Sequence, residues 1–274
     1  MAAKAQIRAL NVYPVKSCRG IASAALRLAA TGFDRDRHWL IVRLSGRFVT
    51  QRELPRMALI ATRLTASGLV LGAPAMPDLE VAERVDGPSI DVVIWKDSCH
   101  AVDQGDAAGA WLKKFLGTDL RLVAFDTRHE RVSSPQWTQG VHAITQFADA
   151  FALLAIAGAS LDDLNSRLAR PLPMERFRPN IVLDGLNAYD EDRIAELHGD
   201  GVCLRVVKAC TRCSITTTNQ ATGEVEGDEP LRTLKSYRYS KALKGVMFGQ
   251  NAIVVEGAGR TLQVGEELDI IWRE

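Results

Sequence analysis

The chain has 274 residues, of which 47% are hydrophobic and 24% charged, so it has enough apolar sequence for one large or two small domains, and disorder is excluded. Its 34 Lys and Arg against 33 Asp and Glu leave a formal net charge of +1, which excludes the strong overall field of a protein that binds nucleic acid or an anionic membrane. Any anionic ligand must therefore be held by a local cluster of cations.

Short apolar segments of strand length dominate the chain. Each is rich in Val, Ile and Leu and is bounded by Gly, Pro, Asp or Asn. The predicted strands, in chain order, are residues 7–12, 39–44, 59–64, 90–95, 120–125, 180–183, 202–207, 215–218, 252–256 and 268–272. The segment "EGAGRTLQVGEELDIIWRE" near the carboxyl end is expected to form a tight turn followed by two paired strands.

Helical patterns are fewer. Residues 106–116 place their apolar side chains on one face and end before Gly117. A second helix begins at Ser160, with Asp163 three residues on as a capping box, and a third, shorter one follows Pro230. Single helices scattered among strands do not make a doubly wound sheet, so the predicted fold class is α+β, dominated by β-structure.

The polar stretch 126–146 has little periodicity of either kind, so it either separates two units or overlies a site. We expect domains at 1–125 and 126–274. No secretory signal or membrane-spanning segment is evident, and five cysteines suit a reducing compartment, so the expectation is a cytoplasmic protein with neither nucleic acid nor membrane as partner. The five histidines have no mutual spacing typical of a metal site.

The motif "KACTRCSITTT" carries the sharpest chemical signal. Cys210 and Cys213 have C-x-x-C spacing after an apolar strand, and the neighbouring Lys208 and Arg212 would stabilise a thiolate, which attacks electrophiles or binds metal. A structural zinc site lacks enough further ligands, and a thioredoxin-type pair would open a helix, whereas "SITTT" is strand-like. Two inert buried thiols remain the alternative.

Three polar clusters offer donors to an anion. The loop "YPVKSCRG" carries Lys16, Ser17 and Arg19, where the Lys-Ser pair is either simply solvated or offers an ammonium and a hydroxyl to an anionic group. The segments "GFDRDRHWLI" and "RFRPNIVLDG" place arginines at the starts of two strands, either as surface ion pairs or as convergent donors to a phosphate.

At these residues the chain resembles a known family. "YPVKSCRG" and "GFDRDRHWLI" look like the N-terminal β-barrel domain that accompanies MOSC domains. "RFRPNIVLDG", "KACTRCSITTTNQATGE", "LKSYR" and "FGQNAIV" resemble the MOSC domain, named for the carboxyl-terminal domain of molybdenum-cofactor sulfurase. The combination is similar to the amidoxime reducing components and to bacterial proteins that reduce N-hydroxylated compounds.

The resemblance implies a fold of an N-terminal barrel-like domain followed by a MOSC barrel, with molybdenum–molybdopterin as the cofactor. It makes Cys213 the thiolate ligand of molybdenum and the catalytic residue, with Cys210 in support. The candidate contacts to the pterin and its phosphate are Lys16, Ser17, Arg37, Arg178, Asn180 and, beside the ligand, Arg212.

The implied activity is the reduction of hydroxylated nucleobases, amidoximes and hydroxylamines. No iron–sulfur cysteine pattern of the C-x4-C-x2-C type occurs in the sequence, so electrons are expected from a separate donor protein. The alternative is a protein that carries or sulfurates the molybdenum cofactor, with a transient persulfide on Cys210 or Cys213.

Overall fold

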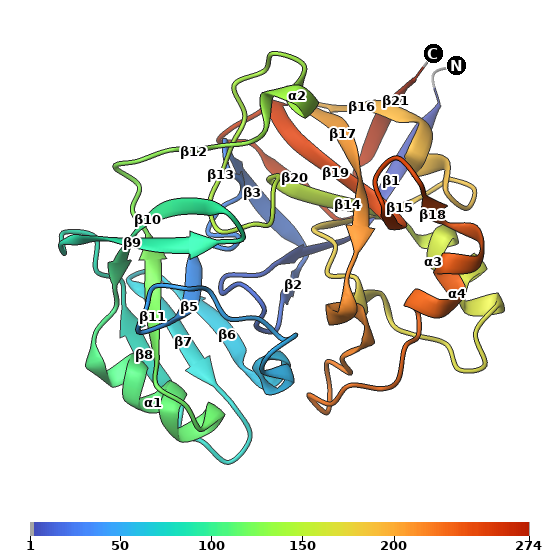
Figure 1. Ribbon diagram of the computed structural model, residues 1–274. Coiled ribbons are helices and arrows are strands. Elements are labelled where there is room, and N and C mark those ends of the chain that lie inside the picture. The colour runs from blue at the N-terminus through green and yellow to red at the C-terminus, as the bar shows by residue number, and fades with distance from the viewer. Residues whose placement is uncertain (1–2, 274) are drawn as a thin grey trace.

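The computed structural model describes residues 3–273 and is dominated by strands, as predicted (Figure 1). Its described α-helices are α1 (Asp106–Leu116), α2 (Pro135–Thr138), α3 (Gly158–Ser166) and α4 (Leu231–Tyr237). Short 3-10 turns cover Pro55–Leu59, Met174–Arg176, Asp190–Arg193 and Ser214–Thr217. None of the helices within residues 3–273 has the length and apolar character needed to cross a membrane.

A closed barrel forms one lobe, which we call the barrel lobe. Within the described residues its seven strands follow the order β14 (Leu153–Ala157), β15 (Ile181–Asp184), β1 (Lys4–Val12), β21 (Glu267–Trp272), β16 (Ile194–Gly199), β17 (Val202–Arg212) and β19 (Gly245–Glu256). Pairing of β14 with β19 closes the ring, because Leu153 lies opposite Ala252. Two short strands, β2 (Ile21–Ser23) and β18 (Tyr239–Ser240), extend it.

The barrel lobe draws its core from both ends of the chain. β1 alternates buried and exposed residues, and its buried Ile7 and Leu10 pack in the same cluster as Leu204 and Leu268. In Figure 1 this blue strand lies among the red and orange strands of the carboxyl half. Alternation with period two is what a strand with one face on a core requires.

The other lobe, which we call the N-terminal lobe, contains two sheets and one helix. Its strands are β5 (Trp39–Arg43), β11 (Leu120–Phe125), β10 (Asp97–Asp103) and β9 (Ser89–Ile94) in one sheet, and β6 (Ala61–Thr65), β7 (Gly68–Gly72) and β8 (Leu79–Ala82) in the other. α1 closes this core with Trp111, Leu112 and Phe115 and ends at Gly117, whose φ of 76° is left-handed, as the sequence predicted.

Two small sheets complete the described fold. β3 (Ala25–Ala29) pairs with both β4 (Gly32–Phe33) and β20 (Thr261–Gln263), and β12 (Arg131–Val132) pairs with β13 (Ile144–Thr145) inside the polar stretch. The predicted pairing of the last two strands is wrong. β20 joins β3, whereas β21 inserts between β1 and β16, because barrel closure offers the last strand two partners rather than one.

Two local predictions are also wrong. Residues 215–218 are not a strand. They overlap the 3-10 turn Ser214–Thr217, in which the Thr216 and Thr217 hydroxyls donate to backbone carbonyls three residues earlier, 3.0 Å and 2.8 Å away. Ser160 does not cap α3, which begins at Gly158. Its hydroxyl donates to the buried Glu191 carboxylate at 2.7 Å instead.

Candidate functional site

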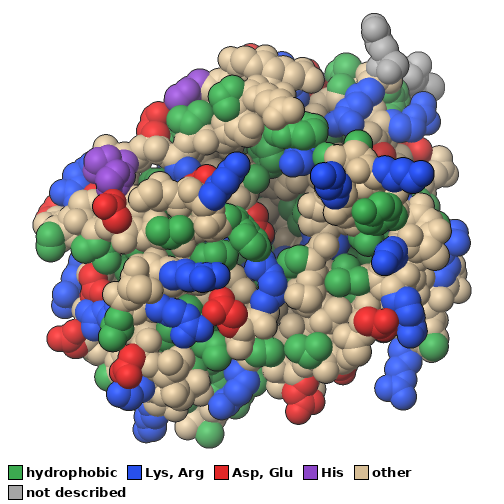
Figure 2. Space-filling view, viewed as in Figure 1, with side chains coloured by type: hydrophobic (Ala, Val, Ile, Leu, Met, Phe, Trp, Pro, Cys, Tyr) green, Lys and Arg blue, Asp and Glu red, His purple; other side chains and the backbone are tan. Residues whose placement is uncertain are grey.

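A cleft between the two lobes brings together all the predicted site residues. Lys16, Ser17, Arg37, Arg178, Asn180, Arg212 and Cys213 line it. It contains about 800 Å³ of empty space, a volume that includes the part open to solvent. Figure 2 shows the hollow between the lobes with Lys and Arg side chains around it. The cleft is therefore open to solvent and lined by cations.

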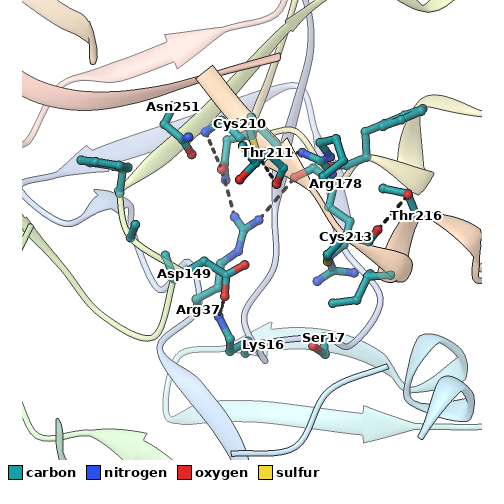
Figure 3. Close-up of a pocket in the computed structure, with 18 of the residues that line it drawn as sticks. Lys16, Ser17, Arg37, Asp149, Arg178, Cys210, Thr211, Cys213, Thr216 and Asn251 are labelled. Atoms are coloured by element: carbon teal, nitrogen blue, oxygen red, sulfur yellow. Dashed lines mark hydrogen bonds and ion pairs between the residues drawn. The ribbon is translucent and has the colours of Figure 1, made fainter. Parts of the chain in front are cut away.

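The two cysteines of the C-x-x-C motif differ in their surroundings. Cys210 lies near the end of β17, where Arg212 Nη1 donates to its sulfur at 3.0 Å. Cys213 follows the strand, precedes the 3-10 turn and is partly exposed to the cleft (Figure 3). Among residues 3–273 no hydrogen bond reaches the Cys213 sulfur. Cys213 thus presents the free thiol, as a metal ligand must.

Opposite the cysteines, the predicted cation Lys16 is buried and paired. Its Nζ donates to Asp149 Oδ1 at 2.7 Å and to the Phe147 carbonyl at 2.8 Å. Burial lowers the pKa of Lys16, although Asp149 opposes this. Desolvation would raise the pKa of Asp149, but the Lys16 ammonium outweighs it and holds that pKa well below its ordinary value. The pair is a fixed charge couple at the wall of the cleft (Figure 3).

Arg37 and Asn180 form a scaffold between the lobes. Asn180 is 1% exposed, and its Oδ1 accepts from Arg37 Nη1 at 2.9 Å and from the Leu154 N–H at 3.1 Å. Its Nδ2 donates to the Asn11 carbonyl at 3.2 Å. Arg37 also donates to Asp36 at 2.5 Å. Most of the hydrogen-bonding capacity of these two side chains is therefore used within the protein.

Arg178 keeps donor capacity. Its Nη1 donates to the Cys18 carbonyl at 2.7 Å, and its guanidinium lies 4.4 Å from the centroid of the Tyr13 ring, which Arg37 also contacts at 4.3 Å. Burial, reinforced by the nearby Arg37 charge, lowers the pKa of Arg178 to about 10. A bound anion would offset the cost of burying this charge.

Unpartnered nitrogens mark where an anion would bind. Within the described chain, six buried side-chain nitrogens or oxygens have no hydrogen-bond partner, and three of these belong to arginines that line the cleft: Arg52 Nε, Arg178 Nη2 and Arg212 Nε. Buried donors are almost always satisfied in folded proteins. These nitrogens and the free Cys213 thiol fit an anionic cofactor that carries a soft metal.

The backbone is strained at the same place. Ser17, Arg37 and Arg178 have φ angles of 67°, 49° and 57°, in the left-handed region that residues other than glycine seldom adopt. Such conformations persist where surrounding contacts enforce them, and they cluster at functional sites. Three of the predicted contact residues thus have backbone conformations that surrounding contacts must maintain.

Other predicted donors point away from the cleft. Arg35 donates to the Thr65 and Gly68 carbonyls at 3.0 Å and 3.1 Å. Arg176 pairs with Glu226 instead. These two arginines are thus used within the protein but not as the surface ion pairs of the alternative, because Arg35 donates to backbone carbonyls and Arg176 is buried.

The sequence did not indicate three residues of this site: Asp149, Arg52 and Arg131. Arg131 lies in the polar stretch 126–146, donates to the Ala148 carbonyl at 2.5 Å and to Asp97 at 2.7 Å, and so fixes the loop that carries Asp149. The expectation that this stretch overlies a site was the available signal.

His198 lies in a polar cluster that the sequence did not indicate. The β16–β17 register sets His198 opposite Cys203, and with Glu196 they offer three ligand atoms within 4.8 Å of one another. Arg205 donates to Glu196 at 2.8 Å and neutralises it, and a structural zinc site needs a fourth ligand, which this group lacks among residues 3–273. The group is therefore an ion-pair cluster on the barrel.

The two β lobes enclose a thiol and unpartnered guanidinium nitrogens, an arrangement that offers a thiolate and cationic donors to an anionic ligand. The MOSC N-terminal beta barrel domain family matches residues 4–119, and the MOSC domain family matches residues 143–269. Mitochondrial amidoxime-reducing component 1 of Mus musculus is 34% identical over 276 residues, covering 96% of this chain and 81% of the relative. Mitochondrial amidoxime reducing component 2 of Homo sapiens is 37% identical over 242 residues, covering 84% and 71%. The chain belongs to the family of MOSC-domain proteins that contains these relatives.

Proposed function

We propose that this protein is a molybdenum-cofactor-dependent reductase of N-hydroxylated compounds. The observation that carries the proposal is the cleft itself, where the free Cys213 thiol faces a wall of cations that includes unpartnered guanidinium nitrogens. The amidoxime reducing components that are 34–37% identical to this chain support the reaction class.

The overall reaction consumes two electrons and two protons. It converts R–NHOH into R–NH2 and water, so the N–O bond breaks and the hydroxyl oxygen leaves as water. A bound molybdenum–pterin group supplies two dithiolene sulfurs and the metal that exchanges electrons with the substrate.

The chain's own residues have separable roles in this proposal. The Cys213 sulfur is the protein ligand of the metal, because a thiolate is a soft donor that molybdenum accepts alongside the dithiolene. Arg178 and Arg212 use their unpartnered nitrogens to bind the anionic part of the cofactor. Lys16 adds an amino group whose Nζ donates to the Asp149 carboxylate. Arg37 and Asn180 hold the wall in position.

The proposal includes a separate electron-donor protein, because the five cysteines lack the spacing of an iron–sulfur site. It also includes a cytoplasmic location. Both are independent of the assignment of Cys213.

The test is metal and pterin analysis of protein expressed with an intact cofactor pathway, followed by reduction of an N-hydroxylated base with an artificial electron donor. Stoichiometric molybdenum with turnover supports the reductase. Molybdenum without turnover overturns it in favour of a cofactor carrier. Cys213→Ser should abolish both metal binding and turnover, since a hydroxyl is a harder and less acidic ligand. A fully loaded, fully active Cys213→Ser protein contradicts the ligand assignment.

A further inference from the structure

Trp95 lies beside the cleft, bonded to its lining residue Asp149, in an unusual conformation. It occupies the turn between β9 and β10, it is 52% exposed, and its φ of 56° lies in the left-handed region. A bulky residue in that region is an outlier whose cost the surrounding contacts must offset.

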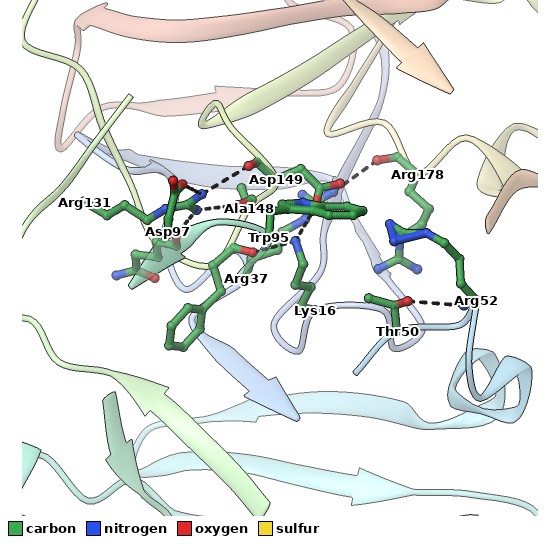
Figure 4. Close-up of polar contacts among 12 residues, drawn as sticks. Lys16, Arg37, Thr50, Arg52, Trp95, Asp97, Arg131, Ala148, Asp149 and Arg178 are labelled. Carbon is green, nitrogen blue, oxygen red and sulfur yellow. Dashed lines mark hydrogen bonds and ion pairs between the residues drawn. The ribbon is translucent and has the colours of Figure 1, made fainter. Parts of the chain in front are cut away.

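Side chains of the cleft hold the indole in place. The Trp95 Nε1–H donates to Asp149 Oδ1 at 3.0 Å, the same oxygen that accepts from Lys16. The Arg52 guanidinium lies 4.4 Å from the indole centroid, and the Phe48 ring packs edge to face at 5.2 Å (Figure 4). Asp149 and Arg52 both line the cleft, so the ring is fixed to its rim.

The turn itself is anchored across the two lobes. Arg131 Nη2 donates to Asp97 Oδ2 at 2.7 Å and to the Asp149 carbonyl at 3.1 Å (Figure 4). Trp95 and Asp97 thus attach the same hairpin to the loop around Asp149. An aromatic ring that is rigid before binding loses little entropy when a ligand stacks on it.

We propose that Trp95 is a specificity-determining residue that selects flat heteroaromatic N-hydroxylated substrates, such as hydroxylated nucleobases. This inference rests on the proposed function and names a substrate class for the same cleft. Arg52 covers part of the ring, and the remaining exposed indole surface stacks the base, as aromatic side chains do with any nucleobase. The N–OH group then extends past Asp149 into the cleft.

The test compares two substrates on the cofactor-loaded protein with an artificial electron donor. N6-hydroxyadenine offers a flat ring, and N-methylhydroxylamine offers none. Trp95→Ala should lower kcat/KM for N6-hydroxyadenine by about tenfold, mainly through KM, and change that for N-methylhydroxylamine less than about twofold. Trp95→Phe, which keeps a ring but loses the N–H, should retain most of the preference for the base.

An equal loss with both substrates overturns the inference, because Trp95 would then act through Asp149 or through electron supply. Thermal unfolding of each variant verifies that it is folded.

A binding measurement separates this inference from the proposed function. Adenine titrated into the protein should quench tryptophan fluorescence. Trp95→Phe should remove most of this quenching. The matched control is Trp272→Phe, which removes another indole contacted by an arginine outside the cleft and should leave the quenching intact. If the wild type reduces neither substrate but adenine binding still depends on Trp95, the reductase proposal fails and the inference that the base stacks on Trp95 stands. If the wild type reduces both substrates and adenine binding does not depend on Trp95, the stacking inference fails.

Discussion

Replacing Asn180 by alanine separates two roles for this residue, a contact to the pterin and a brace between the lobes. The side chain is 1% exposed and makes hydrogen bonds to Arg37, to the Leu154 N–H and to the Asn11 carbonyl. Asn180→Ala removes all three and puts no polar atom in their place. The Arg37 guanidinium still donates to the Asp36 carboxylate in this variant, so its charge remains paired.

The magnitude follows from the two backbone groups that lose their partner. An unsatisfied buried donor or acceptor costs about 1–3 kcal/mol, so the Leu154 N–H and the Asn11 carbonyl together lower the free energy of unfolding by about 3 kcal/mol or more. In a chain of this length about 1 kcal/mol shifts Tm by about 2 °C, so the expected decrease is about 6 °C. Arg37 also loses one anchor, and cofactor occupancy should fall with it.

The assay is thermal unfolding of the cofactor-free protein, followed by molybdenum analysis of the loaded protein. Asn187→Ala is the matched control, because Asn187 is exposed and its side chain bonds to Asp190 alone among the described residues. It should shift Tm by less than about 2 °C. An Asn180→Ala protein with unchanged Tm and reduced cofactor occupancy would refute the bracing role and restore the direct contact.

Three further outcomes are expected. Cys210→Ser should keep measurable molybdenum and turnover, because the Arg212 contact can pass to a hydroxyl; loss equal to that of Cys213→Ser would make Cys210 essential. Lys16→Ala should lower molybdenum occupancy, because it removes the ammonium at the cleft wall. Lys113→Ala, on the exposed surface of α1, is the control and should not lower it. A Lys16→Ala protein with full molybdenum occupancy would show that the loop carrying Lys16 is not part of the site. Burial raises the pKa of Glu191 to about 7, against the opposing Ser160 hydroxyl bond, so the folded protein holds this proton more tightly than the unfolded chain. Glu191 should therefore contribute a fall of about 3 kcal/mol to the free energy of unfolding as pH rises from about 4.5 to about 7. Glu191→Gln should remove that contribution, and a variant whose urea denaturation has the same pH profile as the wild type contradicts it.

Local patterns in the sequence identified elements whose residues bury one face against their own lobe. The strand Leu120–Phe125 and the helix Asp106–Leu116 lie where periodicity and Gly117 put them. The same patterns failed at residues 215–218. β-Branched residues favour a strand, but here threonine hydroxyls donate to nearby backbone carbonyls and stabilise a turn instead.

Residue types and their motifs also identified Cys213, Lys16 and Arg178 as candidates, through the family resemblance, and all three line one cleft. The spacing of the arginines along the chain did not predict which of them would line the cleft. Arg35 and Arg178 have the same kind of sequence context and left-handed backbones, yet Arg35 is consumed by carbonyls near β6 and β7.

The tertiary structure alone decided which further residues join the predicted ones at the cleft. Trp95, Arg131 and Asp149 come from segments 18 to 54 residues apart, and their hydrogen bonds exist because a hairpin of one lobe meets a loop of the other. β1 likewise joins a barrel whose other strands begin at Leu153. A sequence specifies each side chain and its local backbone preference, but contacts between distant segments depend on how buried faces pack together, and that packing is a property of the whole chain.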